Sequence, residues 1–333
     1  MIDSDIKELI HNARRIGVVS HVRPDGDAIG SALGLGLALA YKGKQVQVVL
    51  RDGVSRTFRH LPGAELVKKA FTEECDLYIS VDASDLLRTG GVFGDRQPDI
   101  CIDHHITNTC FAKLNLVDDK SVATCEVLAI HIPAWGLEIT REVADNLLTG
   151  IVSDSIGFRT TNTTSRSLRC AADLMDIGSD ISELHNKALV SRSFEAANYW
   201  GYALGRLERE DRLVWTALTL ADRQRSGYQS NDDADLTNIL SSFEDKDIAV
   251  LFVEQSANQT KVSWRSRPGV DVSKIALEMG GGGHAAAAGA DLTGTFDEIK
   301  SRVLSKTRQY LETIIDEPQN GVQVNGNGAN NGK

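Results

Sequence analysis

Apolar positions in the first half of the chain alternate between helical spacing and short continuous runs. One helical face is marked by five apolar residues near the start: Ile2, Ile6, Leu9, Ile10 and Ala13. Four continuous runs of strand length follow, at residues 16–19, 46–50, 77–81 and 100–102. A helical stretch over residues 27–42 separates the first two runs. This alternation predicts an α/β fold with a doubly wound parallel sheet.

The second half of the chain has long helical stretches and then a second set of strands. Helical spacing covers residues 122–150, and residues 182–210 are also mostly helical, with no strand pattern. Strand-like runs at 213–218, 248–253 and 261–265 and helical stretches at 273–279 and 296–315 predict a smaller α/β domain. The expected organisation is a first domain (1–185), a helical linker (186–210), a second domain (211–316) and a disordered tail (317–333).

Composition and charge narrow the classes of function. The chain has 333 residues and a formal net charge of −10 at pH 7. A protein that coats nucleic acid needs a basic surface, because non-specific binding is to phosphates. Long duplex nucleic acid is therefore not an expected partner, whereas a short phosphate-bearing substrate held by a few cations and metals is compatible with this charge.

Cysteine usage and hydropathy predict a cytoplasmic protein. The five cysteines are odd in number and have no Cys-x-x-Cys spacing, which favours reduced thiols. The first residues lack the basic start and apolar core of a signal peptide. The longest apolar stretch, residues 32–41, is interrupted by glycines and is too short to span a bilayer. We expect no membrane partner.

Acidic and imidazole side chains gather in four stretches, and three of these directly follow predicted strands. The stretches contain His21, Asp25 and Asp27; Asp82; Asp103, His104 and His105; and Asp154. In an open α/β sheet, ligands collect at the carboxyl ends of the strands, so these side chains should converge. Alone, the first stretch is better explained as a turn in which Asp27 caps the next helix. Together, the carboxylates and imidazoles predict a site for two divalent metal ions.

Two glycine-rich segments have different explanations. Gly30, Gly34 and Gly36 lack the pattern of a dinucleotide-binding loop, so close packing of their helix against the sheet explains them better. Residues 280–283 are four glycines followed by His284. This run is either a flexible loop or a place where a ligand approaches the main chain. The solitary His284, with Arg265 on a nearby strand, favours the ligand.

The four stretches resemble the motifs of the DHH phosphoesterase superfamily, and the resemblance covers roughly residues 1–315. It implies that His21, Asp25 and Asp82 hold one metal. It implies that the second metal is held by Asp27, Asp82, His104 and Asp154, so that Asp82 bridges the two. His105 would face the scissile phosphate, which makes His105 and Asp82 the expected catalytic residues.

The glycine run resembles the DHH-associated C-terminal domain, whose Gly-Gly-Gly-His motif grips substrate. By this resemblance Gly281, Gly282, Gly283, His284 and Arg265 would bind substrate. A similar domain ends alanyl-tRNA synthetases, so this segment alone does not establish phosphodiester chemistry. The chain departs from its relatives at one point, because Asp154 is followed by Ser155-Ile156-Gly157 where Thr-Gly is common.

Within the superfamily, the chain is most similar to the NrnA-like branch. The expected function is hydrolysis of short oligoribonucleotides and 3′-phosphoadenosine 5′-phosphate by metal-activated water, with two divalent ions, Mn²⁺ expected, as cofactors. The alternative is a phosphodiesterase for cyclic or linear dinucleotides, and an alternative of another class is a non-catalytic nucleotide- or RNA-binding protein. The expected partner is short RNA or a small nucleotide, and a homodimer stays open.

Overall fold

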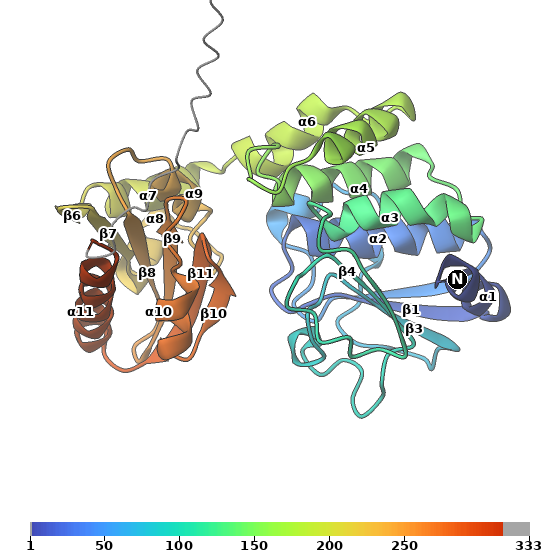
Figure 1. Cartoon of the computed structure of the whole chain (residues 1–333), viewed down its shortest axis with the longest axis horizontal. Coiled ribbons are helices and arrows are strands. Elements are labelled where there is room, and N and C mark those ends of the chain that lie inside the picture. Colours follow the sequence, from blue (N-terminus) through green and yellow to red (C-terminus); the bar gives the residue numbers. More distant parts are fainter. Residues whose placement is uncertain (1, 316–333) are drawn as a thin grey trace, which may run out of the picture. The chain divides into compact units, whose positions relative to one another are not determined.

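The computed structural model describes residues 2–315, which divide into two compact units between Ser191 and Arg192. Each unit has its own sheet, as the colours of Figure 1 make clear. The tail predicted to be disordered, residues 317–333, lies outside the described residues. The domain boundaries at residues 185, 210 and 316 stay predictions.

The first unit is built on a parallel five-stranded sheet in the order β2-β1-β3-β4-β5. Its central strands are the continuous apolar runs of the sequence, as buried parallel strands should be. The predicted α/β class with a parallel sheet is confirmed. The elements of this unit are α1 (Ile2–Asn12), β1 (Arg15–Val19), α2 (Gly26–Tyr41), β2 (Gln45–Val49), η1 (Arg56–Phe58), η2 (Ala64–Leu66), β3 (Leu77–Val81), η3 (Leu87–Thr89), β4 (Ile100–Asp103), β5 (Leu114–Val117), α3 (Thr124–His131), η4 (Ile132–Trp135), α4 (Arg141–Asp154), α5 (Ser165–Asp176), α6 (Ile181–His185) and η5 (Asn186–Val190).

The two faces of this sheet are covered by different material. Helices α2, α3 and α4 lie together over one face (Figure 1), where Ile79 joins the main apolar core. Successive side chains of a strand point to opposite faces, so Tyr78 points the other way. There it packs against Phe71 and Phe93, with ring centroids 5.2 and 6.3 Å away. The sheet is therefore buried on both faces, so functional groups are expected where its strands end.

Helix α2 approaches α4 so closely that an added Cβ atom at two of its glycines would force neighbouring atoms to shift. A Cβ atom on Gly30 would lie 2.4 Å from the carbonyl oxygen of Asn146, and one on Gly34 would lie 2.9 Å from the Leu147 side chain. Gly36 faces the sheet, where its Cβ would lie 2.6 Å from Val48. The interpretation that these glycines pack against the sheet therefore holds for Gly36 and is wrong for Gly30 and Gly34.

The second unit contains a six-stranded mixed sheet in the order β10-β11-β9-β8-β7-β6. Only β7 and β8 among its neighbouring pairs are parallel within the described residues. This confirms a second, smaller α/β domain. Its elements are α7 (Phe194–Leu204), β6 (Glu208–Glu210), β7 (Leu213–Leu218), α8 (Leu220–Ser226), α9 (Leu236–Ser241), β8 (Ile248–Ser256), β9 (Gln259–Ser266), α10 (Ser273–Glu278), β10 (Gly282–His284), β11 (Ala287–Thr293) and α11 (Phe296–Ile315).

Three strands of this sheet have poor strand-forming sequences. Strand β6 lies in the segment predicted to be helical, and its exposed, charged residues suit the edge of a sheet. Strands β10 and β11 consist mostly of glycine and alanine, which have little intrinsic strand propensity. Their backbones come so close that a Cβ atom on Gly283 would lie 2.5 Å from the Ala287 carbonyl oxygen. Close pairing therefore outweighs propensity here.

Among residues 2–315, none of the helices combines the length and the apolar character needed to cross a membrane.

A Gly→Ala substitution in the contact between α2 and α4 should have the opposite effect on stability to one at an open helical position. Gly30→Ala should lower the free energy of unfolding by roughly 1–3 kcal/mol, because the added methyl group overpacks the helix pair. Gly201→Ala on α7, where nothing lies within 4 Å of the added Cβ, should raise it by up to about 1 kcal/mol. Urea unfolding followed by circular dichroism measures both, and a Gly30→Ala protein as stable as the wild type would contradict the packing.

Candidate metal centre

The predicted metal-binding side chains follow strands that end at one edge of the first sheet. His21 and Asp25 come after β1, Asp82 is the first residue after β3, and His104 is the first residue after β4. In this strand order the chain leaves β1 in one direction and returns on its other side at β3, which creates a switch point between them. Ligand sites of open α/β sheets form at such points. Asp154, the last residue of α4, joins them from the helical layer.

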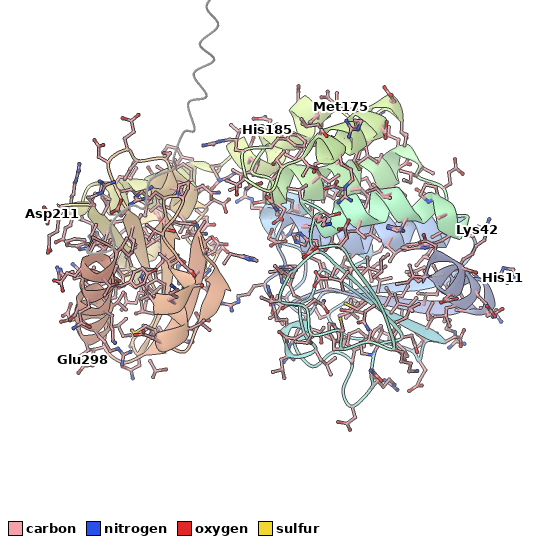
Figure 2. The ribbon with its side chains drawn as sticks, in the orientation of Figure 1. His11, Lys42, Met175, His185, Asp211 and Glu298 are labelled. Carbon is pink, nitrogen blue, oxygen red and sulfur yellow. The ribbon has the colours of Figure 1, made fainter. Side chains whose placement is uncertain are left out.

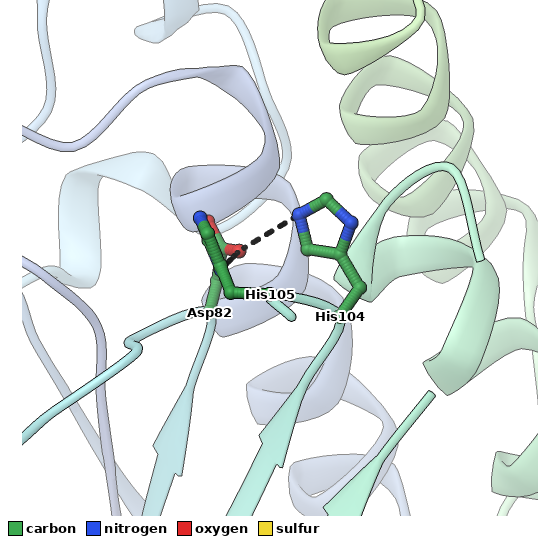
Figure 3. A group of neighbouring side chains, drawn as sticks. All are labelled: Asp82, His104 and His105. Atoms are coloured by element: carbon green, nitrogen blue, oxygen red, sulfur yellow. Dashed lines mark ion pairs between the residues drawn. The ribbon is translucent and has the colours of Figure 1, made fainter. Parts of the chain in front are cut away.

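Asp82 lies at the centre of the group. Its side chain is 2% exposed, and its backbone adopts φ of 54°, a left-handed conformation that aspartate tolerates better than most residues. The backbone N–H of Asp82 donates to the Ile102 carbonyl, 2.9 Å away, which ties this turn to β4. Figure 3 shows the carboxylate directed toward His104, with His105 beside it.

The two oxygens of Asp82 face different partners. Oδ2 lies 3.5 Å from His21 Nε2, which is itself 3.8 Å from Asp25 Oδ2. Oδ1 lies 3.7 Å from His104 Nε2. These separations are too long for good hydrogen bonds but suit atoms that share an ion, since ligands about 2.1 Å from a metal lie roughly 3 Å apart in an octahedral site.

His104 brings the second group together. Its Nε2 lies 3.9 Å from Asp27 Oδ2 and 3.6 Å from Asp154 Oδ2, in addition to its approach to Asp82. Three overlapping sets each offer ligand atoms within 4.8 Å of one another: His21, Asp25 and Asp82; Asp27, His104 and Asp154; and Asp82, His104 and His105. The structure thus gathers the seven residues named from the sequence for metal binding and catalysis in the first unit. Their roles as ligands stay predictions.

Hydrogen bonds fix the orientation of each imidazole. His21 Nδ1 donates to the Val22 carbonyl at 2.8 Å, and His104 Nδ1 donates to the Ser121 carbonyl at 3.3 Å. In the neutral form of both rings Nε2 is then the nitrogen with the lone pair, and it is turned toward the carboxylates. His105 differs, because its Nδ1 donates to the Asp103 carboxylate at 2.7 Å. Asp103 was part of the sequence motif, but this orienting contact was not predicted.

The first stretch of ligands also shapes the local backbone. The Asp25 carboxylate caps α2 by accepting from the N–H groups of Asp27 and Ala28, at 3.1 and 3.0 Å. The capping role considered for Asp27 therefore belongs to Asp25. Asp27 instead accepts from the N–H groups of Thr124 and Cys125, at 2.7 and 2.9 Å, at the start of α3.

Electrostatics in the group are dominated by burial and by repulsion between carboxylates. Burial raises the pKa of Asp27, and the neighbouring charges of Asp82 and Asp154 raise it further. Burial also raises the pKa of Asp154, which reaches about 7 with the help of Asp25 and Asp82. In Asp82 the effect of burial is outweighed by the neighbouring His21 and by the charges of His104 and His105, so its pKa is lowered.

Both inward-facing histidines favour the protonated form when only protein surrounds them. Burial opposes the charge on His21, but Asp82 and Asp25 outweigh it and raise the pKa to about 9. For His104 the charges of Asp154, Asp27 and Asp82 likewise outweigh burial and raise the pKa to about 9. Without metal ions, the protonated imidazoles of His21 and His104 thus offset part of the negative charge of the carboxylates. Hard oxygen and imidazole ligands around a concentration of negative charge fit divalent ions well.

The predicted substrate residues lie in the second unit. Arg265 on β9 stands opposite Ala287 of β11, which stands opposite His284 of β10. Residues directly opposite one another point to the same face, so Arg265 and His284 share a face, two strand spacings or roughly 10 Å apart. Gly282 and Gly283 belong to the same hairpin, and Gly281 precedes it. The binding role of these residues stays a prediction.

Two of the remaining histidines lie outside these sets. Both are labelled in Figure 2: His11 is exposed on α1, and His185 lies on α6. A Cβ atom added to Gly157 would lie 2.7 Å from His185 Nε2. Neither belongs to a potential metal-binding group within the described residues.

Comparison with known proteins identifies the family. Residues 15–151 match the DHH family N-terminal domain, and residues 220–313 match the DHHA1 domain. The bifunctional oligoribonuclease and PAP phosphatase NrnA of Thermus thermophilus is 34% identical over 299 residues, which cover 89% of this chain and 90% of that protein. The chain belongs to the DHH family. By this membership it is a phosphoesterase. The NrnA of Mycoplasma genitalium is 30% identical over 84% of this chain and 89% of its own length.

Solved structures agree with this fold. An exopolyphosphatase-related protein from Bacteroides fragilis superimposes on the DHH chain with a TM-score of 0.84, at 24% identity, over 93% of this chain and 95% of its own. RecJ from Thermus thermophilus, solved in complex with Mn²⁺, gives a TM-score of 0.52 at 16% identity, over 94% of this chain and 54% of its own. At these identities the likeness shows the fold alone.

The raised pKa values predict how pH affects the chelator-treated protein. A group whose folded-state pKa lies above its unfolded value contributes stability that is lost as pH rises between the two. The shifts of His21 and His104 from 6.5 to about 9 act between those values, and that of Asp154 from 3.8 to about 7 acts in the same direction at lower pH. In the presence of a chelator, the thermal midpoint of unfolding should therefore decrease as the pH rises from 6.5 to 9.

The control for this experiment is the same pH series with excess Mn²⁺, where deprotonated ligands should bind the ion and remove most of the loss. A chelated protein whose midpoint is unchanged between pH 6.5 and pH 9 would contradict the electrostatic description of the site.

Proposed function

We propose that this DHH phosphoesterase hydrolyses short oligoribonucleotides and 3′-phosphoadenosine 5′-phosphate, with two divalent metal ions bound at the carboxyl edge of the first sheet. The proposal rests mainly on the position of the Asp82 carboxylate, whose two oxygens face different groups of ligands. One oxygen faces His21, and the other faces His104. A carboxylate placed between two groups of ligands suits a bridge between two ions.

The proposed ligands are His21, Asp25 and Asp82 for one ion, and Asp27, Asp82, His104 and Asp154 for the other. Ions bound there would supply Lewis acidity toward a phosphoryl oxygen and generate a nucleophile from water at neutral pH. The residues of the chain fix the ligand geometry. The Nδ1 bonds to backbone carbonyls keep Nε2 of His21 and His104 directed inward.

His105 has a different proposed role. The bond from its Nδ1 to Asp103 Oδ1 holds the ring, and Asp103 also accepts from Asn108 Nδ2 at 2.6 Å, which fixes the carboxylate in turn. An imidazole oriented by a buried carboxylate can stabilise charge that develops on a phosphoryl oxygen. We therefore assign His105 to contact with the scissile phosphate. Asp82, the proposed bridging ligand, is the second catalytic residue.

Recognition of the substrate is assigned to the second unit. A guanidinium and an imidazole on one face of the hairpin-bearing sheet offer charge-assisted hydrogen bonds to a phosphate. The glycines beside His284 allow close approach to the main chain. The relatives named NrnA are described as oligoribonuclease and PAP phosphatase, which favours short RNA and a small nucleotide as substrates. Mn²⁺ as the native ion and a cytoplasmic location complete the proposal, and a homodimer stays open.

A panel of substrates tests this function. With Mn²⁺, the chain should hydrolyse 3′-phosphoadenosine 5′-phosphate and a diribonucleotide faster than cyclic di-adenylate or pyrophosphate. A chelator or Asp82→Asn should abolish turnover, whereas Asp176→Asn, at the exposed end of α5, should leave it unchanged. Preferential hydrolysis of cyclic di-adenylate would favour a dinucleotide phosphodiesterase. Nucleotide binding without any turnover would favour a non-catalytic protein.

Arg265 and His284 should affect substrate recognition more than metal binding. A charge-assisted contact contributes about 1.5–3 kcal/mol, so Arg265→Ala or His284→Ala should lower kcat/KM on a diribonucleotide roughly tenfold to a hundredfold. The loss should be smaller on a chromogenic phosphodiester that offers no distal nucleotide. Arg225→Ala, exposed on α8, is the matched control. Equal losses on both substrates, or loss of bound metal, would argue against a recognition role.

A further inference from the structure

Residues 121–125, which end the connection from β5 and begin α3, contact three of the proposed metal ligands. The N–H groups of Thr124 and Cys125 donate to the two oxygens of Asp27, at 2.7 and 2.9 Å. The Thr124 hydroxyl donates to Asp82 Oδ1 at 3.0 Å, and the Ser121 carbonyl accepts from His104 Nδ1 at 3.3 Å. The conformation of residues 121–125 therefore sets how these ligands are directed.

The N–H groups of the first two residues of α3 donate to the Asp27 side chain. The first N–H groups of a helix lack partners within the helix and are usually satisfied by the side chain of the N-cap residue. The N-cap here is Ala123, which has no side-chain acceptor. Asp27 takes its place from the other side of the site, and the positive end of the helix dipole favours its negative charge.

This segment is fixed from behind by Glu126. The Glu126 side chain is fully buried, with 0% of its surface exposed. Its Oε2 accepts from the Val122 N–H at 2.8 Å and from the Ser167 hydroxyl at 2.9 Å, while Oε1 accepts from Arg166 Nε at 2.9 Å. A buried carboxylate is unfavourable unless it is paired and hydrogen-bonded, so this arrangement depends on Arg166.

Arg166 extends the same network to the other end of the segment. Its Nη2 donates to the Ser121 hydroxyl at 2.7 Å and to Asp118 Oδ2 at 2.8 Å. One guanidinium on α5 thus holds Ser121 directly and Val122 through Glu126. These two residues, followed by Ala123, precede Thr124 and Cys125, whose groups donate to Asp27 and Asp82.

We propose that Arg166 and Glu126 are positioning residues, which fix residues 121–125 and through them orient Asp27, Asp82 and His104 for divalent metal binding. The inference rests on the proposed metal centre. Partners that orient metal ligands from behind commonly change metal affinity or activity by 10–100-fold when they are altered. Arg166 should therefore affect the affinity for metal without touching the ions or the substrate.

Titration of the metal-stripped full chain with Mn²⁺ alone, followed by calorimetry, tests this assignment. Arg166→Gln should bind Mn²⁺ at least about tenfold more weakly than the wild type, with the number of sites unchanged. Excess Mn²⁺ should restore most of its kcat on a diribonucleotide, and KM at saturating Mn²⁺ should stay close to the wild-type value. Arg169→Gln is the matched control, since Arg169 is exposed on the same helix and donates to Ser165 Oγ at 3.1 Å.

Circular dichroism establishes whether each variant folds. If Arg166→Gln does not fold, Arg166→Lys decides, because lysine keeps the charge but cannot reproduce the fork of bonds to Glu126, Asp118 and Ser121. Wild-type Mn²⁺ affinity in the folded Arg166 variant, or an equal loss in Arg169→Gln, would overturn the positioning role. A wild-type chain that binds no Mn²⁺ would overturn the proposed metal centre and this inference with it.

Discussion

Repulsion between buried carboxylates is the constraint on which the first unit depends. Asp27 and Asp82 are 1% and 2% exposed, and both approach His104 within 4 Å together with Asp154. Negative charges held this close in a dry environment raise each other's pKa unless cations or donors offset them. Histidines and backbone N–H groups supply part of the compensation. Divalent ions are chemically suited to supply the rest of the positive charge. For this reason we assign this edge of the sheet to metal-dependent phosphoester hydrolysis.

The architecture concentrates these charges at one edge of the sheet. Parallel strands bring their carboxyl ends to one edge, and the left-handed turn at Asp82 directs a single carboxylate toward two groups of ligands. The glycine contacts between α2 and α4 allow the helical layer to approach, so that Asp154 reaches the same place as Asp27. Recognition of the nucleotide is assigned to residues of the second unit, which lie on a separate sheet. This assignment predicts that metal binding and substrate recognition can be altered independently.

Sequence patterns predicted the parts of the molecule that rest on local rules. The apolar runs at β1, β3 and β4 predicted buried parallel strands, and the polar residues after them predicted a convergent site. Strands β10 and β11 were not predicted, because glycine and alanine pair there for reasons of close contact and not of propensity. The bonds from Glu126 and Arg166 were also missed. They join segments about 40 residues apart in the chain, and no spacing rule indicates such contacts.

The most direct test of the bridging role of Asp82 is a crystal structure of the chain grown with Mn²⁺, with the ions located by anomalous scattering. A two-ion centre predicts two peaks about 3.5–4 Å apart, one on the His21 side of the Asp82 carboxylate and the other on the His104 side. A single peak, or two peaks that do not both contact Asp82, would contradict the bridge.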